Sequence, residues 1–299
     1  MDTTYALKGT DLKKKFKNFE LNVPEVTIPA GFATAMIGEN GAGKTTLLNM
    51  MTGIRLDYSG SFEYFGEASN GKSEADSEVK NRIGYTGTDN YYLPTWTVGQ
   101  IEELSEMLFD NFNRDEFARY CRDMAIFGDR AIDKNKKVSQ LSDGTRTKLM
   151  LAGVLARDTD MLILDEPASP LDPLMRDKLC DLIREYIAAK PGRTVLFSTH
   201  NIMDMENVTD YAIIMAHGNI IEADFVENLK EKYILVKGEA EDAEAAGKYM
   251  VSISKSKYGF EGICLAENLD KLAGMDISTE EASLFNISVA IMKSQSLVR

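Results

Sequence analysis

A glycine-rich stretch carries the clearest chemical pattern in the sequence, because Gly38-Glu39-Asn40-Gly41-Ala42-Gly43-Lys44-Thr45 fits G-x-x-x-x-G-K-[ST]. In such a loop the glycines let the backbone curl so that successive N–H groups point at phosphate oxygens, and a following helix adds its positive N-terminal dipole. Lys44 is expected to reach the β- and γ-phosphates, and the Thr45 hydroxyl to coordinate Mg²⁺. The residues expected to bind the nucleotide are Gly38, Glu39, Asn40, Gly41, Ala42, Gly43, Lys44, Thr45 and Thr46.

Two carboxylates follow the apolar run Met161-Leu162-Ile163-Leu164. A buried strand that ends in an aspartate such as Asp165 can hold Mg²⁺ opposite a phosphate loop, usually through water. The next residue, Glu166, can polarise the water that attacks the γ-phosphate. An apolar strand ending in acids is common by itself, but behind a phosphate-binding loop it predicts the second half of a hydrolytic site.

Alternating strands and helices must hold these two sites together. Apolar runs predict buried strands at 32–37, 161–164, 194–198 and 211–215, and helical patterns predict helices at 44–51, ended by Gly53, and at 176–188. This alternation indicates an α/β fold with a mainly parallel sheet covered on both faces. Further expectations are short strands at 5–7 and 19–23 with Lys13–Lys15 at a solvated edge, an exposed loop at 66–77, and helical structure at 99–127.

The pattern changes after about Glu227. Residues 239–244 form an acidic surface segment, and residues 249–254 alternate like a strand. The last stretch of about 25 residues is typical of an amphipathic helix with Leu284, Ile287 and Ile291 on one face. We therefore expect a main domain at 1–227 and a small α+β accessory domain at 228–299.

Composition excludes several classes of protein. The chain has 299 residues and a formal net charge of −13, which argues against binding to nucleic acid. No apolar run approaches the roughly 20 residues of a membrane-spanning helix, and the first residues show no signal-peptide pattern. Cys121, Cys180 and Cys264 are too far apart for a metal-binding pair. These features predict a cytoplasmic protein with reduced, buried thiols.

Three further motifs resemble those of ABC-type ATPases. Leu141-Ser142-Asp143-Gly144-Thr145 resembles the LSGGQ signature, with Asp and Thr at the third and fifth places. Residues 167–172 resemble the D-loop, with Pro170 where glycine is frequent, and Thr199-His200 stands at the place of the switch histidine. Because the motifs occur in family order over about 5–225, the resemblance implies a P-loop NTPase domain. It would have a mainly parallel sheet, an antiparallel β portion and a helical subdomain at about 88–155.

The resemblance also implies a mechanism and further site residues. Two such domains sandwich two ATP molecules, so Ser142 and Gly144 of one protomer would contact the γ-phosphate held by the other. His200 would hydrogen-bond the γ-phosphate near Glu166. By alignment, Phe16 would stack on adenine; a core phenylalanine is the alternative, and Phe19 is the competing choice. A lone histidine such as His217 is ordinarily structural or exposed.

One position departs from the family pattern. A glutamine that ligates Mg²⁺ normally follows the strand at 82–85, but Thr88 occupies its place. Thr88 or Asp89 would substitute for it, through a shorter side chain or a bridging water. The expected metal ligands are therefore Thr45, Asp165 and Thr88.

The segment at 91–98, Tyr-Tyr-Leu-Pro-Thr-Trp-Thr-Val, is rich in aromatic residues. In the family this segment lines a groove that receives a cytoplasmic helix of a membrane permease, and Trp96 is the preferred contact; internal packing is the alternative. The appended C-terminal segment and the pattern at 83–85 and 93–98 most resemble bacterial exporters of drugs and peptides. It implies an ATP-hydrolysing subunit that pairs with a second ATPase protomer, identical or not, and energises export of a peptide, drug or lipid-like substrate at the inner face of the cell membrane. The alternative is a soluble ABC ATPase that drives a cytosolic machine such as iron–sulfur cluster assembly.

Overall fold

A six-stranded sheet forms the centre of the computed structural model, which describes residues 4–69, 75–128 and 131–296. Its spatial order is β10 (Asn219–Phe225), β9 (Tyr211–Ala216), β3 (Ala33–Ile37), β8 (Thr194–Thr199), β7 (Met161–Asp165) and β6 (Ile83–Thr86). Neighbouring strands run parallel except β10 and β9. The predicted α/β class with a mainly parallel sheet is therefore confirmed. Because parallel strands share one carboxyl edge, the residues that follow β3, β7 and β8 meet there.

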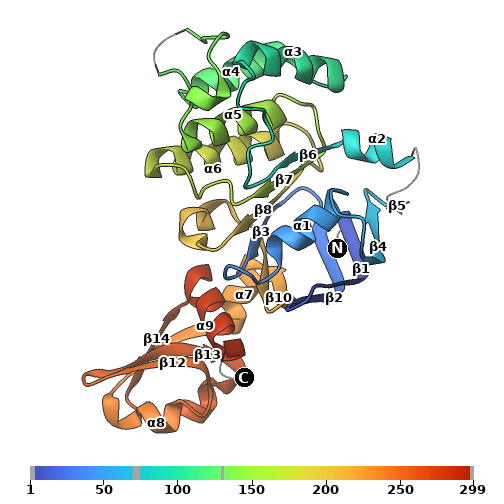
Figure 1. Cartoon of the computed structure of the whole chain (residues 1–299). Helices are drawn as coiled ribbons and strands as arrows, with labels where there is room; N and C mark the ends of the chain where they lie inside the picture. The colour runs from blue at the N-terminus through green and yellow to red at the C-terminus, as the bar shows by residue number, and fades with distance from the viewer. Residues whose placement is uncertain (1–3, 70–74, 129–130, 297–299) are drawn as a thin grey trace.

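The central strands separate two hydrophobic cores. Along β7, Ile163 faces a core shared with helix α1 (Lys44–Met51), whereas Leu162 and Leu164 face a core shared with α5 (Asp143–Leu155) and α6 (Pro173–Ala188). Strands buried on both faces are expected to be apolar without alternation, which is how β3, β7 and β8 were recognisable. Figure 1 shows the helices on either side of this sheet.

A second, antiparallel sheet packs on the α1 side. Its order is β2 (Glu20–Pro29), β1 (Tyr5–Lys15), β4 (Ser59–Tyr64) and β5 (Glu67–Ser69). The strands predicted at 5–7 and 19–23 lie within β1 and β2, which are longer than expected. The placement of Lys13–Lys15 at a sheet edge was wrong, because β1 extends through Lys15 and lies between β2 and β4. Lys13 pairs in register with Asn22 on one side and Ser59 on the other. The lysines remain in a strand because buried Leu7 and Leu12 fix its inner face.

A group of helices lies beyond the β6 edge. The helical prediction for 99–127 corresponds to α3 (Val98–Leu108) and α4 (Arg114–Asp123), each begun by a side-chain cap, from Thr97 and Asn113 respectively. The predicted loop at 66–77 was partly wrong, because it includes β5 and the start of α2 (Ala75–Asn81); residues 70–74 lie outside the described part.

The C-terminal segment is an antiparallel sheet with helices on both faces. After α7 (Val226–Lys232) the sheet has the order β12, β13, β11, β14, and α9 follows it. The bounds are β11 (Tyr233–Gly238), α8 (Ala243–Ala246), β12 (Met250–Ser256), β13 (Gly259–Leu265), β14 (Ile277–Glu281) and α9 (Leu284–Ser296). In Figure 1 this segment lies at the end of the molecule opposite α3 and α4. The predicted domain boundary at 227/228 falls inside α7.

Helix α9 lies between the C-terminal sheet and the central sheet, with contacts to both β12 and β9. Leu284, Ile287 and Ile291, the predicted inward face, are buried. Within the described ranges, no helix is long and apolar enough to cross a membrane.

Candidate active site

The phosphate-binding loop joins β3 to α1, and its glycines have a steric reason. Gly41 and Gly43 have positive φ angles of 85° and 107°, a left-handed conformation that favours glycine. A Cβ atom on Gly38 would lie 2.6 Å from the Met215 carbonyl oxygen. The loop exposes Glu39, Asn40 and Gly41, whereas Gly38 and Ala42 are buried. α1 begins at Lys44, so Thr45, which is exposed, and the half-buried Thr46 lie in its first turn.

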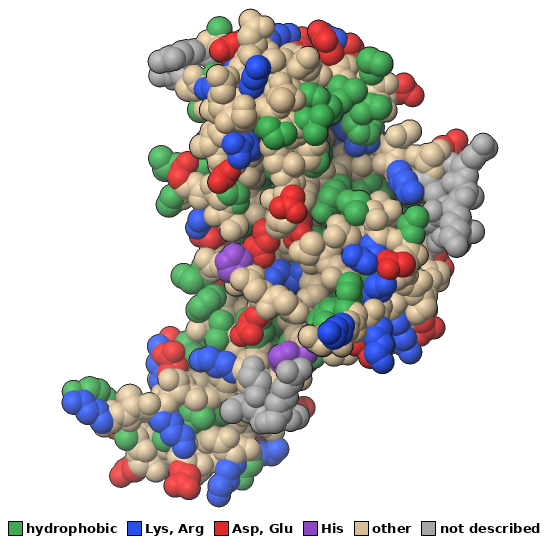
Figure 2. Space-filling model, viewed as in Figure 1, with side chains coloured by type: hydrophobic (Ala, Val, Ile, Leu, Met, Phe, Trp, Pro, Cys, Tyr) green, Lys and Arg blue, Asp and Glu red, His purple; other side chains and the backbone are tan. Residues whose placement is uncertain are grey.

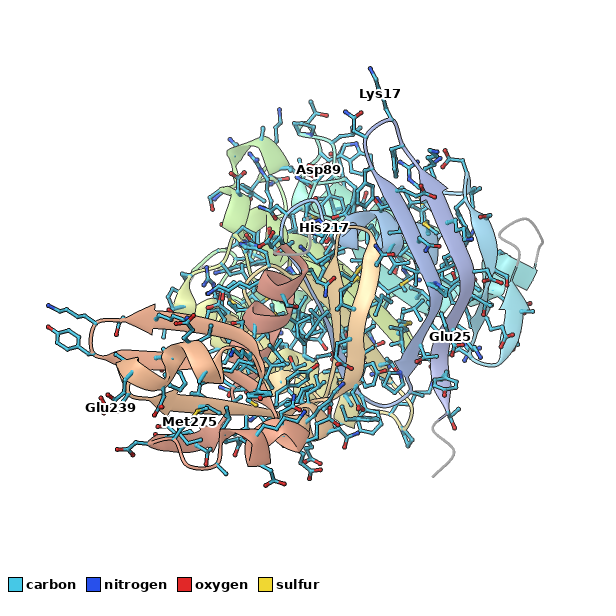
Figure 3. The ribbon with its side chains drawn as sticks, turned by 90° about the horizontal axis from the view of Figure 1, so that it is seen from below. Lys17, Glu25, Asp89, His217, Glu239 and Met275 are labelled. Carbon is cyan, nitrogen blue, oxygen red and sulfur yellow. The ribbon has the colours of Figure 1, made fainter. Side chains whose placement is uncertain are left out.

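A tight turn between β9 and β10 supports this loop. The Gly218 N–H donates to the Ala42 carbonyl at 3.0 Å, and a Cβ on Gly218 would come within 2.0 Å of the Glu20 carbonyl oxygen. The neighbouring His217 is exposed at the tip of the turn, where Figure 3 labels it. Sequence reasoning missed this contact, although the Ala-His-Gly-Asn turn between two strands is visible in the sequence.

Lys44 connects the loop to the second carboxylate. Its side chain is only 6% exposed, and Nζ donates to the carbonyl oxygens of Gly38 at 2.7 Å and Glu39 at 3.3 Å. Nζ also lies 3.3 Å from Oε1 of Glu166, and the other Glu166 oxygen, Oε2, lies 2.8 Å from Nδ1 of His200. The structure thus brings together Lys44, Glu166 and His200, which are far apart in the sequence.

Asp165 ends β7 in a fully enclosed position. It is 2% exposed; Oδ1 accepts a hydrogen bond from Ser198 at 2.5 Å, and Oδ2 has no hydrogen-bond partner within the described residues. Leaving a buried carboxylate oxygen unpaired is costly, so the position suits a group that arrives with its own positive charge or bound water. This orphaned oxygen is the observation by which the chain fits Mg²⁺.

A polar pocket of about 370 Å³ opens beside these carboxylates. It is lined by Asn40, Thr86, Gly87, Thr88, Thr147, Asp165, Glu166, Pro167, Ser169, Pro170 and His200. Thr88, the residue at the glutamine position, therefore lines the same pocket as Asp165, whereas Asp89 does not. No cluster of three His, Cys, Asp or Glu side chains in the described ranges could hold a metal alone, so an ion here needs hydroxyl, phosphate or water ligands as well. Figure 2 shows acidic side chains and a histidine close together at the middle of this face.

Tyr85 of β6 connects this strand to α1. Burial, and to a smaller extent the negative charge of Asp165, raise the pKa of Tyr85 to about 12. The phenol is therefore a hydrogen-bond donor at neutral pH, and it donates to Oδ1 of Asn49 in α1 at 3.1 Å. This bond ties the strand before Thr88 to the helix after the phosphate loop.

Two predicted residues lie outside the pocket. Ser142 is exposed and caps α5 by accepting the Thr145 N–H at 3.3 Å. Gly144 follows it, and a Cβ there would lie 2.9 Å from the Pro170 carbonyl oxygen. The signature-like segment is thus packed beside residues 167–172, and neither Ser142 nor Gly144 lines the pocket that holds Glu166.

The two aromatic residues proposed for adenine differ in their surroundings. Phe16 is half-buried just after β1, with Nζ of Lys14 and the Arg55 guanidinium 5.4 and 5.2 Å from its ring centre. Phe19 packs against the phosphate loop, since its ring would lie 3.0 Å from a Cβ on Gly43. Phe19 therefore packs against the phosphate loop, and Phe16 lies beside it with the two ring centres 5.9 Å apart.

An apolar groove lies on the other side of β6. Its volume is about 440 Å³, and it is lined by Ile54, Ile83, Tyr85, Tyr91, Tyr92, Trp96, Ile101, Leu104, Ser105, Leu108, Phe109, Gly153, Val154 and Arg157. Trp96 is half-buried and packs on the core, so both alternatives for it, packing and surface contact, have a physical basis. In Figure 2 hydrophobic side chains gather around α3 near this groove.

Comparisons of the sequence and of the structure with known proteins indicate the same family. The family model described as "ABC transporter" matches residues 21–169. A nickel import ATP-binding protein, NikO of Rhodobacter capsulatus, is 30% identical over 210 residues, which cover 68% of this chain and 82% of that protein. An uncharacterised ABC transporter ATP-binding protein of Nostoc, all4389, is 26% identical over 299 residues, covering 96% of this chain and 87% of its own. Among solved structures, the dimeric bacterial ABC transporter cassette MJ0796 shares the fold, with a TM-score of 0.63 at 21% identity over 73% of this chain and 98% of that one.

Proposed function

This chain belongs to the ABC transporter family as an ATP-binding subunit and is an ATPase that uses ATP with Mg²⁺, and from that premise we propose that it energises export through a separate membrane permease. The ATP-hydrolysing part of the proposal depends on one observation above the others, the contact of both Lys44 and His200 with Glu166, which lines the polar pocket. A buried cation, a carboxylate and a hydrogen-bonding imidazole beside a phosphate-binding loop are the groups that phosphoryl transfer to water requires.

Each of the three side chains has a separate task in the proposed reaction. Lys44 binds the β- and γ-phosphates, giving up its contact with Glu166 as phosphate oxygens approach. Glu166, then released, orients the attacking water and accepts its proton. His200, at the end of β8, donates a hydrogen bond to the γ-phosphate and keeps that phosphate in line with the water.

Mg²⁺ supplies charge neutralisation at the β- and γ-phosphates when it is bound. Thr45, Asp165 and Thr88 are the side chains proposed to hold it. Asp165 fits because its Oδ2 is buried without a partner in the described ranges, and Thr88 fits because it lines the same pocket. Phe16 is proposed to stack on the adenine, with Phe19 kept for support of the loop.

ATPases of this family act as dimers with a membrane permease, and the second protomer completes the site. We place Ser142 and Gly144 against the γ-phosphate held by the partner, because both lie on a surface outside their own pocket. A small residue and a helix N-terminus allow backbone N–H groups to approach phosphate closely.

The apolar groove is the proposed contact for the permease, which would hold the chain at the inner face of the cell membrane. Replacing Trp96 with Ala is expected to reduce co-purification with the adjacently encoded membrane protein at least about tenfold, because buried aromatic anchors dominate such contacts. Leu108→Glu, which changes a 61%-exposed residue of the same groove, is expected to do the same without disturbing the core.

The matched control is Tyr258→Ala, which removes a 79%-exposed aromatic residue from the C-terminal sheet. All three variants should keep the ATPase rate of the isolated chain within about twofold. Unchanged co-purification of both groove variants would reject the docking surface, and stable co-purification with a soluble complex instead would favour the iron–sulfur assembly alternative.

The proposed direction is export, of a peptide, drug or lipid-like molecule. It rests on the resemblance of the C-terminal segment and of residues 83–85 and 93–98 to bacterial exporters. The relative named for nickel import shows that the fold alone does not set direction. In inside-out vesicles carrying the chain and its permease, added ATP is expected to drive uptake of a hydrophobic dye. ATP-driven uptake only when the vesicles are right-side-out and ATP is enclosed would contradict export.

A further inference from the structure

We propose that Ser198 is a positioning residue that sets both carboxylates of the hydrolysis site; this inference rests on the function proposed for Asp165 and Glu166. Ser198 lies in β8 directly opposite Asp165 of β7 in the parallel register. It is fully buried, and its one hydroxyl is bonded to both carboxylate residues. Sequence reasoning did not single it out.

The Ser198 hydroxyl donates its single proton to Asp165. Ser198 Oγ donates to Oδ1 at 2.5 Å, whereas Oδ2 of the same carboxylate has no partner among the described residues. A hydroxyl has only one proton, so this bond fixes which of the two oxygens is satisfied and fixes the rotation of the carboxylate plane. The oxygen left over is the one available to the metal or its water.

The Ser198 hydroxyl oxygen accepts a hydrogen bond from Glu166. It accepts the Glu166 backbone N–H at 2.9 Å, at a residue whose φ is 51°. The left-handed conformation is unfavourable for a residue with a Cβ, so it persists only where the surroundings hold it. Here it turns the chain so that the Glu166 carboxylate lies 3.3 Å from Lys44 Nζ and 2.8 Å from His200 Nδ1.

A purely structural role for a buried hydroxyl would not require both bonds. Thr34, on the next strand β3, is also fully buried, and its hydroxyl has no hydrogen-bond partner within the described part of the chain. The sheet therefore accommodates a buried hydroxyl without using it. At Ser198 the donor and an acceptor lone pair are both used, and both partners belong to the hydrolysis site.

The test compares nucleotide affinity with and without the metal in the full-length Ser198→Ala variant. Binding of the non-hydrolysable analogue AMP-PNP is measured by calorimetry in excess Mg²⁺ and in EDTA. The affinity in EDTA is expected to stay within about twofold of wild type, because the phosphate loop is untouched. The gain in affinity on adding Mg²⁺ is expected to fall about three- to tenfold, and kcat for ATP about tenfold or more with a smaller change in KM.

Ser288→Ala is the matched control, since Ser288 in α9 is 1% exposed and also donates its hydroxyl to one bonded partner, the Phe285 carbonyl. It should leave the Mg²⁺-dependent gain and kcat unchanged. A Ser198→Ala variant with the wild-type gain and kcat would overturn the positioning role, as would equal losses in both serine variants. Failure of the wild-type chain to bind AMP-PNP at all would count against the proposed function instead.

Discussion

The proposed hydrolysis site and the C-terminal segment, residues 226–296, are both built on sheets, yet they place polar groups in opposite ways. Lys44 at the start of α1 and Asp165 at the end of β7 are 6% and 2% exposed, and one oxygen of the Asp165 carboxylate has no partner among the described residues. In the C-terminal sheet the ionic groups pair at the surface, as Lys237 does with Glu280 at 2.7 Å, and such exposed pairs contribute about 0–1 kcal/mol. None of the buried unpartnered side-chain atoms found in the described ranges lies beyond residue 225.

The buried polar groups near β7 are placed to bind a ligand, whereas the paired charges of the C-terminal sheet face water. A site that must bind phosphate and metal keeps charges in a low-dielectric setting, where they act strongly but are costly to maintain. The C-terminal segment carries no such cost in its described residues.

The two regions are nevertheless joined by α9. Ile287 belongs to the same hydrophobic core as Phe197 of β8, and the Leu284 N–H donates to Oε1 of Glu206, which follows His200 in the chain, at 2.8 Å. Met292 lines a small pocket of about 90 Å³ together with residues 39–42 of the phosphate loop. Figure 3 shows the helix close to the labelled His217, another residue of that pocket. The C-terminal segment therefore reaches, through α9, both the core beneath β8 and the pocket beside the phosphate loop.

The largest effect is expected from Glu166→Gln. The amide keeps the size of the side chain but replaces one carboxylate oxygen with an NH₂ donor and cannot act as a base, so kcat should fall by about 10²–10⁴, the range for losing a general base. ATP affinity in the presence of Mg²⁺ should be retained, and an ATP-bound dimer should accumulate. Phosphate release and size-exclusion chromatography with ATP measure the two outcomes.

The control for this prediction is Lys237→Ala, which removes a partly exposed cation from the C-terminal sheet. Its kcat should stay within about twofold of wild type if the contrast between the regions holds. Comparable losses of kcat in Lys237→Ala and Glu166→Gln would break that contrast, and a Glu166→Gln enzyme that turns over normally would remove Glu166 from the mechanism.

The parts of the site that depend on local pattern were predictable. The phosphate loop needs glycines where φ is positive, and the spacing from Gly38 to Lys44 reports that need directly. Asp165 and Glu166 were recognisable because β7 is apolar throughout. Ser198 and Gly218 were not, because their contacts depend on the register of β7 with β8 and on a turn packing beneath the loop, which only the tertiary fold determines.

The prediction of helices and strands had the same limit, because elements that depend on tertiary contacts were not recognisable from local pattern. The strands buried on both faces and the apolar face of α9 were predicted, since continuous or periodic apolar residues mark them. The predicted loop at 66–77 includes the start of α2, because the sequence of this short helix, Ala-Asp-Ser-Glu-Val-Lys-Asn, is almost wholly polar and only Val79 is buried among its described side chains. The strands β11, β13 and β14 were not identified, because each finds its partner only in the assembled C-terminal sheet.

A smaller effect, on stability rather than rate, tests whether the two regions unfold together. Ile287→Ala removes a fully buried side chain from α9 and is expected to lower the free energy of unfolding by about 2–4 kcal/mol. Trp96 is the sole tryptophan and lies beside α3, far from α9 in the fold, so its fluorescence during urea unfolding reports on the ATP-binding part alone.

If α9 shares one core with β8, the Trp96 transition should shift to lower urea in Ile287→Ala and remain a single step. Phe285→Ala, on the same helix but 36% exposed, should shift it much less and controls for changes in helix propensity. A Trp96 midpoint that is unchanged in Ile287→Ala, with a separate loss of helical signal at lower urea, would show that residues 226–296 unfold as an independent unit. The two regions would then differ in stability as well as in how they place polar groups. The packing of α9 beside the phosphate loop would not be required for the ATP-binding part to stay folded.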